Sequence, residues 1–200
     1  MSATIETERL DLRLLSVADA ADVFAYASDP EVAANTSWFA HERLEDAESF
    51  VTNVVGAHSE AEGSLRHVWA IRLRGDGTVI GTIDLVQDSI SVAHVDFALA
   101  RKYWSRGIMT EATRAVLDWG FRRLPRLQEV RSGGLTRNAG TMRVLEKLGF
   151  ELRVRTNAPR PPKFPDEALE ASHFSLSREA FWAKGSRRTA GGKSRPRNDR

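Results

Sequence analysis

Residues 99–112 combine a glycine, basic side chains and the expected start of a helix. Alternating apolar residues before this stretch predict a strand, and the apolar spacing from about Met109 predicts a helix. Gly107 lies in the turn between them, where glycine permits unusual backbone angles and a close approach to a ligand. The amides and positive dipole end of a helix start suit a phosphate. The nearby basic residues are Arg101, Lys102 and Arg106. The residues alone also fit a plain turn with solvated charges.

A second stretch, residues 138–150, begins with a helix-capping residue and ends with a helix stop. Asn138 predicts the start of a helix that ends at Leu148, and Gly149 follows where a left-handed residue commonly closes a helix. A cap and a stop are ordinary features of any helix. What distinguishes this stretch is its combination, in this order and at this distance, with residues 99–112.

These stretches belong to a series of expected strands and helices. Period-two apolar patterns predict strands over 10–14, 67–72, 79–86, 91–99, 128–132, 150–154 and 171–177. Helices are predicted over 16–27, 44–55, 109–124, 138–148 and 178–182. The order predicts an α/β (α+β) mixed sheet, mostly antiparallel, with flanking helices and one right-handed strand–helix–strand crossover.

Length and composition bound the class of protein. With 200 residues, 42% hydrophobic and 28% charged, the chain predicts one globular domain with its own core. The absence of cysteine excludes disulfides, thiolate metal sites and a catalytic thiol. The five histidines lack the spacing of a zinc site, so no metal is expected. Neither a signal peptide nor a membrane-length apolar run is present, so we expect a cytoplasmic protein without membrane contact.

Charge is distributed unevenly along the chain. The net charge is +2, but residues 185–200 carry +5 and leave −3 for residues 1–184. The last 16 residues contain no large apolar side chain, so we expect a folded domain over 1–184 and a disordered basic tail over 185–200. Because the basic residues concentrate in that tail, the sequence does not favour nucleic acid as a partner.

Two motifs together resemble the GCN5-related N-acetyltransferases (GNAT), and specifically their RimJ/RimL-type branch. They are Tyr103-Trp-Ser-Arg-Gly-Ile-Met-Thr-Glu-Ala112 and, after Asn138, Arg143-Val-Leu-Glu-Lys-Leu-Gly-Phe150. Weaker matches are Thr7-Glu-Arg-Leu-Asp-Leu-Arg13, Ser28-Asp-Pro-Glu31 and Val79-Ile-Gly-Thr-Ile83. The resemblance covers about residues 7–182. It implies a GNAT fold and transfer of an acetyl group from acetyl-CoA to a primary amine.

The resemblance also implies where acetyl-CoA binds. In such folds the strand before the loop splays from its neighbour, and its backbone receives the pantetheine arm. That backbone here is Phe97, Ala98 and Leu99, and the loop amides that hold the pyrophosphate belong to Ser105, Arg106, Gly107, Ile108, Met109 and Thr110. Asn138 matches the asparagine that hydrogen-bonds the cofactor arm. Met109 replaces a small residue of the family pattern, which backbone binding tolerates if the side chain points away.

The acceptor amine must lose a proton before it attacks the thioester, because a lysine-type amine has a pKa near 10.4 and an α-amine one near 8. The glutamate of this branch falls at His94 when counted back from Trp104, and the family glycine falls at Asp96. Both lie two apart on one strand and so share a face. Asp96 then raises the pKa of His94 or is itself the base. Otherwise His94 is only a polar residue on a half-exposed strand.

The leaving thiolate and the acceptor are less defined. Many relatives place a tyrosine where this chain has Leu145, and RimL-like proteins place a hydroxyl where it has Thr141. Without a cysteine, transfer must be direct within a ternary complex. The family builds its acceptor site from the first helices and last hairpin, so the expected lining is Trp38, Phe39, His41 and Phe164.

The acceptor class stays open between a protein or peptide N-terminus and a small-molecule amine. The alternative to an enzyme is a non-catalytic CoA-binding or regulatory module, favoured by Leu145, Met109 and the histidine at position 94. The oligomeric state, including a homodimer, is not determined by the sequence.

Overall fold

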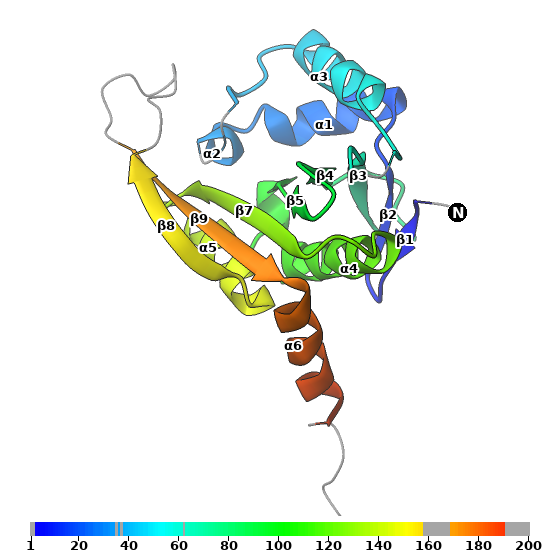
Figure 1. Ribbon diagram of the computed structural model, residues 1–200. Helices are drawn as coiled ribbons and strands as arrows, with labels where there is room; N and C mark the ends of the chain where they lie inside the picture. Colours follow the sequence, from blue (N-terminus) through cyan, green and yellow to red (C-terminus); the bar gives the residue numbers. More distant parts are fainter. Residues whose placement is uncertain (1–2, 35, 37, 62, 158–168, 191–200) are drawn as a thin grey trace, which may run out of the picture.

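The computed structural model describes residues 3–34, 36, 38–61, 63–157 and 169–190, with the backbone alone for 185–190. Its nine-stranded sheet has the order β1-β2-β3-β4-β5-β7-β9-β8, with β6 paired to β4 (Figure 1). The strands are β1 (Ile5–Glu6), β2 (Leu10–Leu14), β3 (Arg66–Leu73), β4 (Gly81–Gln87), β5 (Val92–His94), β6 (Phe97–Leu99), β7 (Glu129–Leu135), β8 (Glu151–Asn157) and β9 (Glu170–Ser177). Only β5 and β7 pair in parallel among these strands.

Helices cover both faces of this sheet. They are α1 (Ala20–Ala27), α2 (Pro30–Ala33), α3 (Leu44–Gly56), α4 (Ile108–Arg123), α5 (Ala139–Leu148) and α6 (Arg178–Ala190), with short 3₁₀ turns at Val17–Asp19 and Arg101–Tyr103. The chain between β5 and β7 passes through α4, which is the crossover that the sequence predicted. The expected mixed, mostly antiparallel α/β fold is confirmed.

Alternating side chains of β3 supply two separate apolar clusters. Trp69 and Ile71 pack with α4 and α5 on one face, whereas Val68 and Ala70 pack under α1 and α3 on the other (Figure 1). This alternation follows from the two-residue period of a strand. The central strands β3 and β4 are therefore mostly buried on both faces of the sheet, and the groups that they carry are positioned by packing from both sides.

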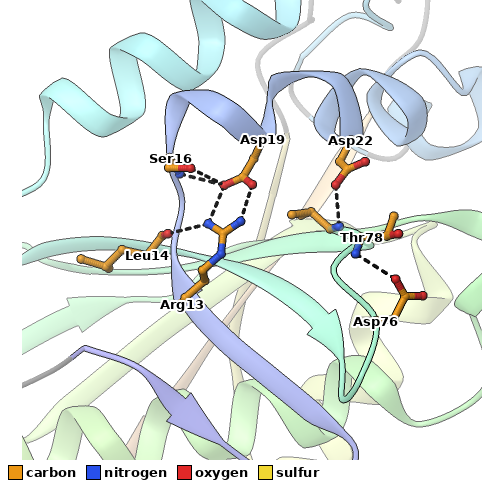
Figure 2. Close-up of polar contacts among 8 residues, drawn as sticks. Arg13, Leu14, Ser16, Asp19, Asp22, Asp76 and Thr78 are labelled. Carbon is orange, nitrogen blue, oxygen red and sulfur yellow. Dashed lines mark hydrogen bonds and ion pairs between the residues drawn. The ribbon is translucent and has the colours of Figure 1, made fainter.

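A partly buried ion pair joins the sheet to the α1–α3 layer. Arg13 of β2 donates two hydrogen bonds to the carboxylate of Asp19, which also accepts from the backbone N–H and hydroxyl of Ser16 (Figure 2). Burial alone would raise the pKa of Asp19, but these hydrogen bonds hold it below its usual value. Asp22 accepts a hydrogen bond from the Val79 amide at 2.8 Å, which makes a second tie between α1 and the sheet.

Three local features differ from the sequence prediction. The strand expected over 91–99 is divided into β5 and β6, since Val95 bonds to Arg131 of β7 while β6 pairs with β4. The two-residue β1 and the one-turn α2 were not predicted, because both are too short to show a period. Helix α6 continues to Ala190, so the first six residues of the expected disordered tail are helical. Residues 191–200 lie outside the described residues, and the division at 184 stays a prediction.

The described residues contain neither a membrane-spanning helix nor a cluster of metal-binding side chains. None of the described helices has the length and apolar character needed to cross a membrane. No group of three or more histidine, aspartate or glutamate side chains in the described ranges could hold a metal ion.

Candidate functional site

One large cleft, of about 1740 Å³, lies where the sheet divides. One end, which we call the loop half, is formed by β6, residues 104–110 and the start of α5. The other end, the acidic half, holds Asp84, Asp88, His94 and Asp96. The lining runs from Val32 to Ser175, so the cleft brings together segments that lie far apart in the sequence.

The division of the sheet begins beside Val95. Its amide donates to the Arg131 carbonyl at 2.9 Å, and its carbonyl accepts from the Ser132 hydroxyl at 2.8 Å. Beyond this point β6 pairs with β4, whereas β7 continues alongside β9. Phe97, Ala98 and Leu99 therefore line the cleft opposite residues 133–135 of β7. The side of β6 that faces away from β4 therefore borders this opening.

The loop after β6 turns directly into α4. Gly107 is the N-cap residue of α4 and has a left-handed backbone with a φ of 74°. The first amides of a helix have no partner within the helix, so those of Ile108, Met109 and Thr110 are available at the rim of the cleft. Met109 is 6% exposed and belongs to the core. Its side chain therefore packs inward and leaves the backbone amide at this position accessible to a ligand. The loop can therefore present backbone donors to an anion.

Thr7 and Arg9, in the connection between β1 and β2, hold this loop in place. The Arg9 guanidinium donates to Glu111 at 2.6 Å and to the Arg106 carbonyl at 3.0 Å. The Thr7 hydroxyl donates to the other oxygen of Glu111 at 2.6 Å. Partial burial alone would raise the pKa of Glu111, but these hydrogen bonds hold it below its usual value. Glu111 is thereby directed away from the cleft, and the loop is fixed to the β1–β2 connection.

Two predicted residues do not reach the cleft with their side chains. Arg106 is exposed, and its guanidinium lies 5.7 Å from the ring centre of Tyr103. Phe39 is 56% exposed, whereas its neighbour Trp38 lines the cleft and packs 5.7 Å from His41. Trp38 and Phe39 therefore do not both face inward. Phe164 lies outside the described residues.

The start of α5 completes the loop half. The Asn138 side chain accepts a hydrogen bond from the Thr141 amide at 3.1 Å, which is the expected helix cap. Asn138 and Thr141 both line the cleft. Leu145 instead lies fully buried in the apolar core. A hydroxyl at position 141 therefore borders the cleft, while position 145 faces the interior.

His94 has a different partner from the expected one. Its Nδ1 lies 2.7 Å from Asp88 Oδ1, in the turn between β4 and β5, so it is Asp88 rather than Asp96 that hydrogen-bonds the ring. Asp96 is exposed at the surface of the cleft. The surrounding walls still limit its hydration, which raises the pKa of Asp96, and the charge of His94 acts in the opposite direction. Both predicted residues line the cleft and share one side of it.

Asp84 is a residue of the cleft that the sequence interpretation missed. It lies in the middle of β4, half-buried, and lines the acidic half. Loss of hydration and the nearby charge of Asp96 raise its pKa to about 7. The available signal was an aspartate inside an otherwise apolar strand, a position where aspartate is uncommon.

The comparisons with known proteins identify the family. The family model for the acetyltransferase (GNAT) domain matches residues 9–151. A probable N-acetyltransferase of Bacillus subtilis, YjcK, is 41% identical over 78 residues, which are 38% of this chain and only 42% of that protein's length. An uncharacterized N-acetyltransferase of the same organism, YoaA, is 29% identical over 153 residues, which are 76% of this chain and 84% of YoaA.

A solved structure agrees with this assignment. A GNAT-family acetyltransferase from Bacillus anthracis superimposes with a TM-score of 0.75 at 22% identity, covering 88% of this chain and 99% of that one. At this identity the superposition supports the fold alone. The family model spans most of the chain, and it includes the loop, α4 and α5 that form the loop half of the cleft. The chain therefore belongs to the GNAT family of N-acetyltransferases.

Proposed function

We propose that the protein transfers an acetyl group from acetyl-CoA directly to a primary amine, with both substrates bound at once. The observation that carries this proposal is the single cleft that joins separated strands, a helix start and titratable groups. The first two features suit an extended, phosphate-bearing thioester. The third suits an amine that must lose a proton.

The loop half has the groups that acetyl-CoA requires. The stretch from Phe97 to Leu99 lines the opening on the side of β6 away from β4, and its main chain would hold the pantetheine arm. The amides of Ser105, Gly107, Ile108, Met109 and Thr110 would hold the pyrophosphate, supported by the α4 dipole. The Arg106 amide belongs to the same loop, although its side chain points elsewhere. Bound acetyl-CoA would supply the thioester whose carbonyl the amine attacks.

The remaining predicted roles fit the geometry of the cleft. Asn138 and Thr141 lie on the wall from which the cofactor arm and its sulfur would be reached. His94 and Asp96 stand on the acceptor side as the sequence's candidates for the base. Trp38 is proposed as apolar lining for the acceptor.

For the acceptor we propose a protein N-terminus, as in the RimJ/RimL-type branch, or a small cationic amine. The branch rests on the motifs at 103–112 and 138–150. The acidic groups at one end of the cleft favour an acceptor that arrives protonated and positive. We propose the cytoplasm as the place of action.

A thiol-release assay tests the activity. Free CoA is measured with a thiol reagent while acetyl-CoA is offered with peptides of varied N-termini, polyamines, amino acids and aminoglycosides. The chain contains no cysteine, so the reagent reports CoA without background from the protein. Amine-dependent CoA release is expected. Binding of acetyl-CoA with no release for any amine would instead identify a non-catalytic CoA-binding module.

A further inference from the structure

We propose that the carboxylate of Asp84, on β4, is the group that accepts the proton from the acceptor amine. This inference rests on the proposed acetyl transfer and names a catalytic residue for it. Asp84 was not a candidate from the sequence. Three features of its surroundings carry the inference: its place in the sheet, its fixed orientation and the charges that face it.

The position of Asp84 is set by strand pairing. The register pairs Ile83 with Phe97 and Val86 with His94, which brings Asp84 opposite Asp96 where β5 gives way to β6. This is the point at which the sheet divides. Asp84 therefore lies on the strand adjacent to the backbone proposed to hold the pantetheine arm, on the same side as His94.

A hydrogen bond to the opposite strand fixes the orientation of the carboxylate. The Asp84 amide donates to the Asp96 carbonyl at 2.9 Å, as in a regular antiparallel pair. The return bond is different, because the Asp96 amide donates to Asp84 Oδ1 at 2.7 Å. The side chain thus takes the place of a main-chain acceptor in the ladder. One oxygen is held by the sheet, and Oδ2 is left to receive a proton.

The charges around Asp84 come from two neighbouring strands. Arg66 on β3 and His94 on β5 favour its charged form, whereas Asp96 disfavours it. From the helical layer, the described residues that line the cleft include Phe50 and Val54 of α3, which are apolar. Limited hydration of the Asp84 carboxylate is the largest influence on its pKa, and hydration and charges together give a pKa of about 7. A base of that strength is about half charged at neutral pH and suits proton transfer from an amine.

The other carboxylates of the acidic half are less suited. Asp88 hydrogen-bonds His94, and Asp96 is exposed. Through their charge, His94 and Asp96 oppose each other in setting the proton affinity of Asp84. On this account they are positioning residues that act through Asp84.

The proton and electron balance is complete without another reactant. An R–NH₃⁺ acceptor gives one proton to Asp84 Oδ2, directly or through one water, and its nitrogen lone pair forms the C–N bond with the acetyl carbon. The C–S bond breaks with its electron pair on sulfur. The second proton of the nitrogen goes to the thiolate, which gives the amide and CoA thiol, and Asp84 returns its proton to solvent.

The test is Asp84→Asn, because asparagine keeps an oxygen for the Asp96 amide and removes only the basic oxygen. We expect kcat/KM to fall at least about 100-fold, with the Kd for acetyl-CoA within twofold of wild type. The wild-type rate should fall as the pH drops through about 7, and the variant should lack this limb. Asp11→Asn, the same change on β2 outside the cleft lining, is the matched control and should retain wild-type kinetics.

Several outcomes would overturn the role of Asp84. One is an Asp84→Asn enzyme that retains the acidic limb and more than a third of the wild-type rate. A second contradicting outcome is that Asp96→Asn or His94→Gln loses the acidic limb of the pH–rate profile while Asp84→Asn retains it. A third measurement needs neither catalysis nor a variant: the ¹³C resonance of the Asp84 carboxyl, assigned through bonds from the wild-type backbone resonances, should titrate near pH 7. A midpoint below about 5 contradicts the inference even if the variant folds poorly.

The failure of this inference differs from the failure of the proposed function. If the wild type binds acetyl-CoA but releases no CoA with any amine, the proposed activity fails and the role of Asp84 fails with it. If the wild type turns over and Asp84→Asn does so equally well, only the role of Asp84 fails.

Discussion

The two halves of the cleft are built in different ways. The loop half consists mainly of backbone: a left-handed glycine, the first amides of α4 and one uncovered edge of β6. The acidic half consists of side chains, three aspartates and a histidine carried by β4, β5 and the two connections on either side of β5. The loop half is suited to a ligand common to a whole family. The acidic half depends on individual residues and is suited to a partner particular to this chain.

This contrast predicts different responses to substitution. Changes in the loop half should alter acetyl-CoA affinity, and changes in the acidic half should alter turnover. Asp84→Asn, described above, tests the acidic half. The following experiments test the loop half and the fold that supports it, from the largest expected effect to the smallest.

Gly107→Glu should have the largest effect on acetyl-CoA affinity, at least about 100-fold. A side chain at a φ of 74° is strained, and its Cβ would lie 3.7 Å from Arg9 Nη2. The new carboxylate would compete with Glu111 for Arg9 and oppose an anion at the α4 start. Calorimetric titration measures the change. Gly75→Glu is the matched control, with a φ of 78° and open space around its Cβ, and it should bind normally. An equal loss of acetyl-CoA affinity in both variants would show that backbone strain, and not the new carboxylate at the start of α4, causes the loss.

Asp19→Asn should destabilise the fold by about 2 kcal/mol, because it leaves Arg13 partly buried without its charged partner. The pKa of Asp19 is lower in the folded state than in the unfolded state, so its stabilisation is present above the unfolded value near 4. It is lost as the pH falls through the lower folded value. Chemical unfolding between about pH 7 and 2 should show this loss in the wild type and less of it in the variant. Acetyl-CoA affinity at 25 °C should be unchanged, because Asp19 lies outside the cleft lining, and a loss of affinity would contradict this expectation.

Asn138→Ala should cost about 1 kcal/mol of stability through the lost α5 cap and also weaken acetyl-CoA several-fold. Asp46→Ala is its control. Asp46 accepts hydrogen bonds from the Glu42 and Arg43 amides at the start of α3, so its loss should cost similar stability and leave affinity unchanged. If the two variants cannot be distinguished by titration, Asn138 is a helix cap and nothing more.

Arg9→Ala should give the smallest effect, about a threefold loss of acetyl-CoA affinity. The Arg9–Glu111 pair is partly exposed and worth little as an ion pair, but it holds the Arg106 carbonyl and hence the loop. Arg74→Ala removes a comparable exposed pair with Glu6, away from the loop, and should have no effect. A larger loss in Arg74→Ala than in Arg9→Ala would refute the loop-holding role.

The loop half was largely predictable because its signals are local. Gly107 and Asn138 act within a few residues of their own positions, where turn and cap preferences apply. The orientation of neighbouring side chains was less predictable. Trp38 and Phe39 were both expected to line the acceptor site, but only Trp38 faces the cleft.

The acidic half was poorly predictable because it depends on strand pairing. Asp84 matters through its register with Asp96, and His94 pairs with Asp88 across a turn rather than with the second residue along its own strand. A strand period gives the face of His94 but not its partner. The Arg9–Glu111 contact spans 102 residues, and no pattern at either end indicates the other.

Thermal unfolding with and without saturating acetyl-CoA tests the central claim most directly, with ATP and NAD as controls. A ligand at about 100 times its Kd stabilises a fold by about 2.7 kcal/mol, which for a domain of this size raises Tm by roughly 5–10 °C. The structure predicts a shift of that size with acetyl-CoA and a much smaller one with ATP or NAD. No shift with acetyl-CoA, or an equal shift with all three, would contradict the assignment of the cleft.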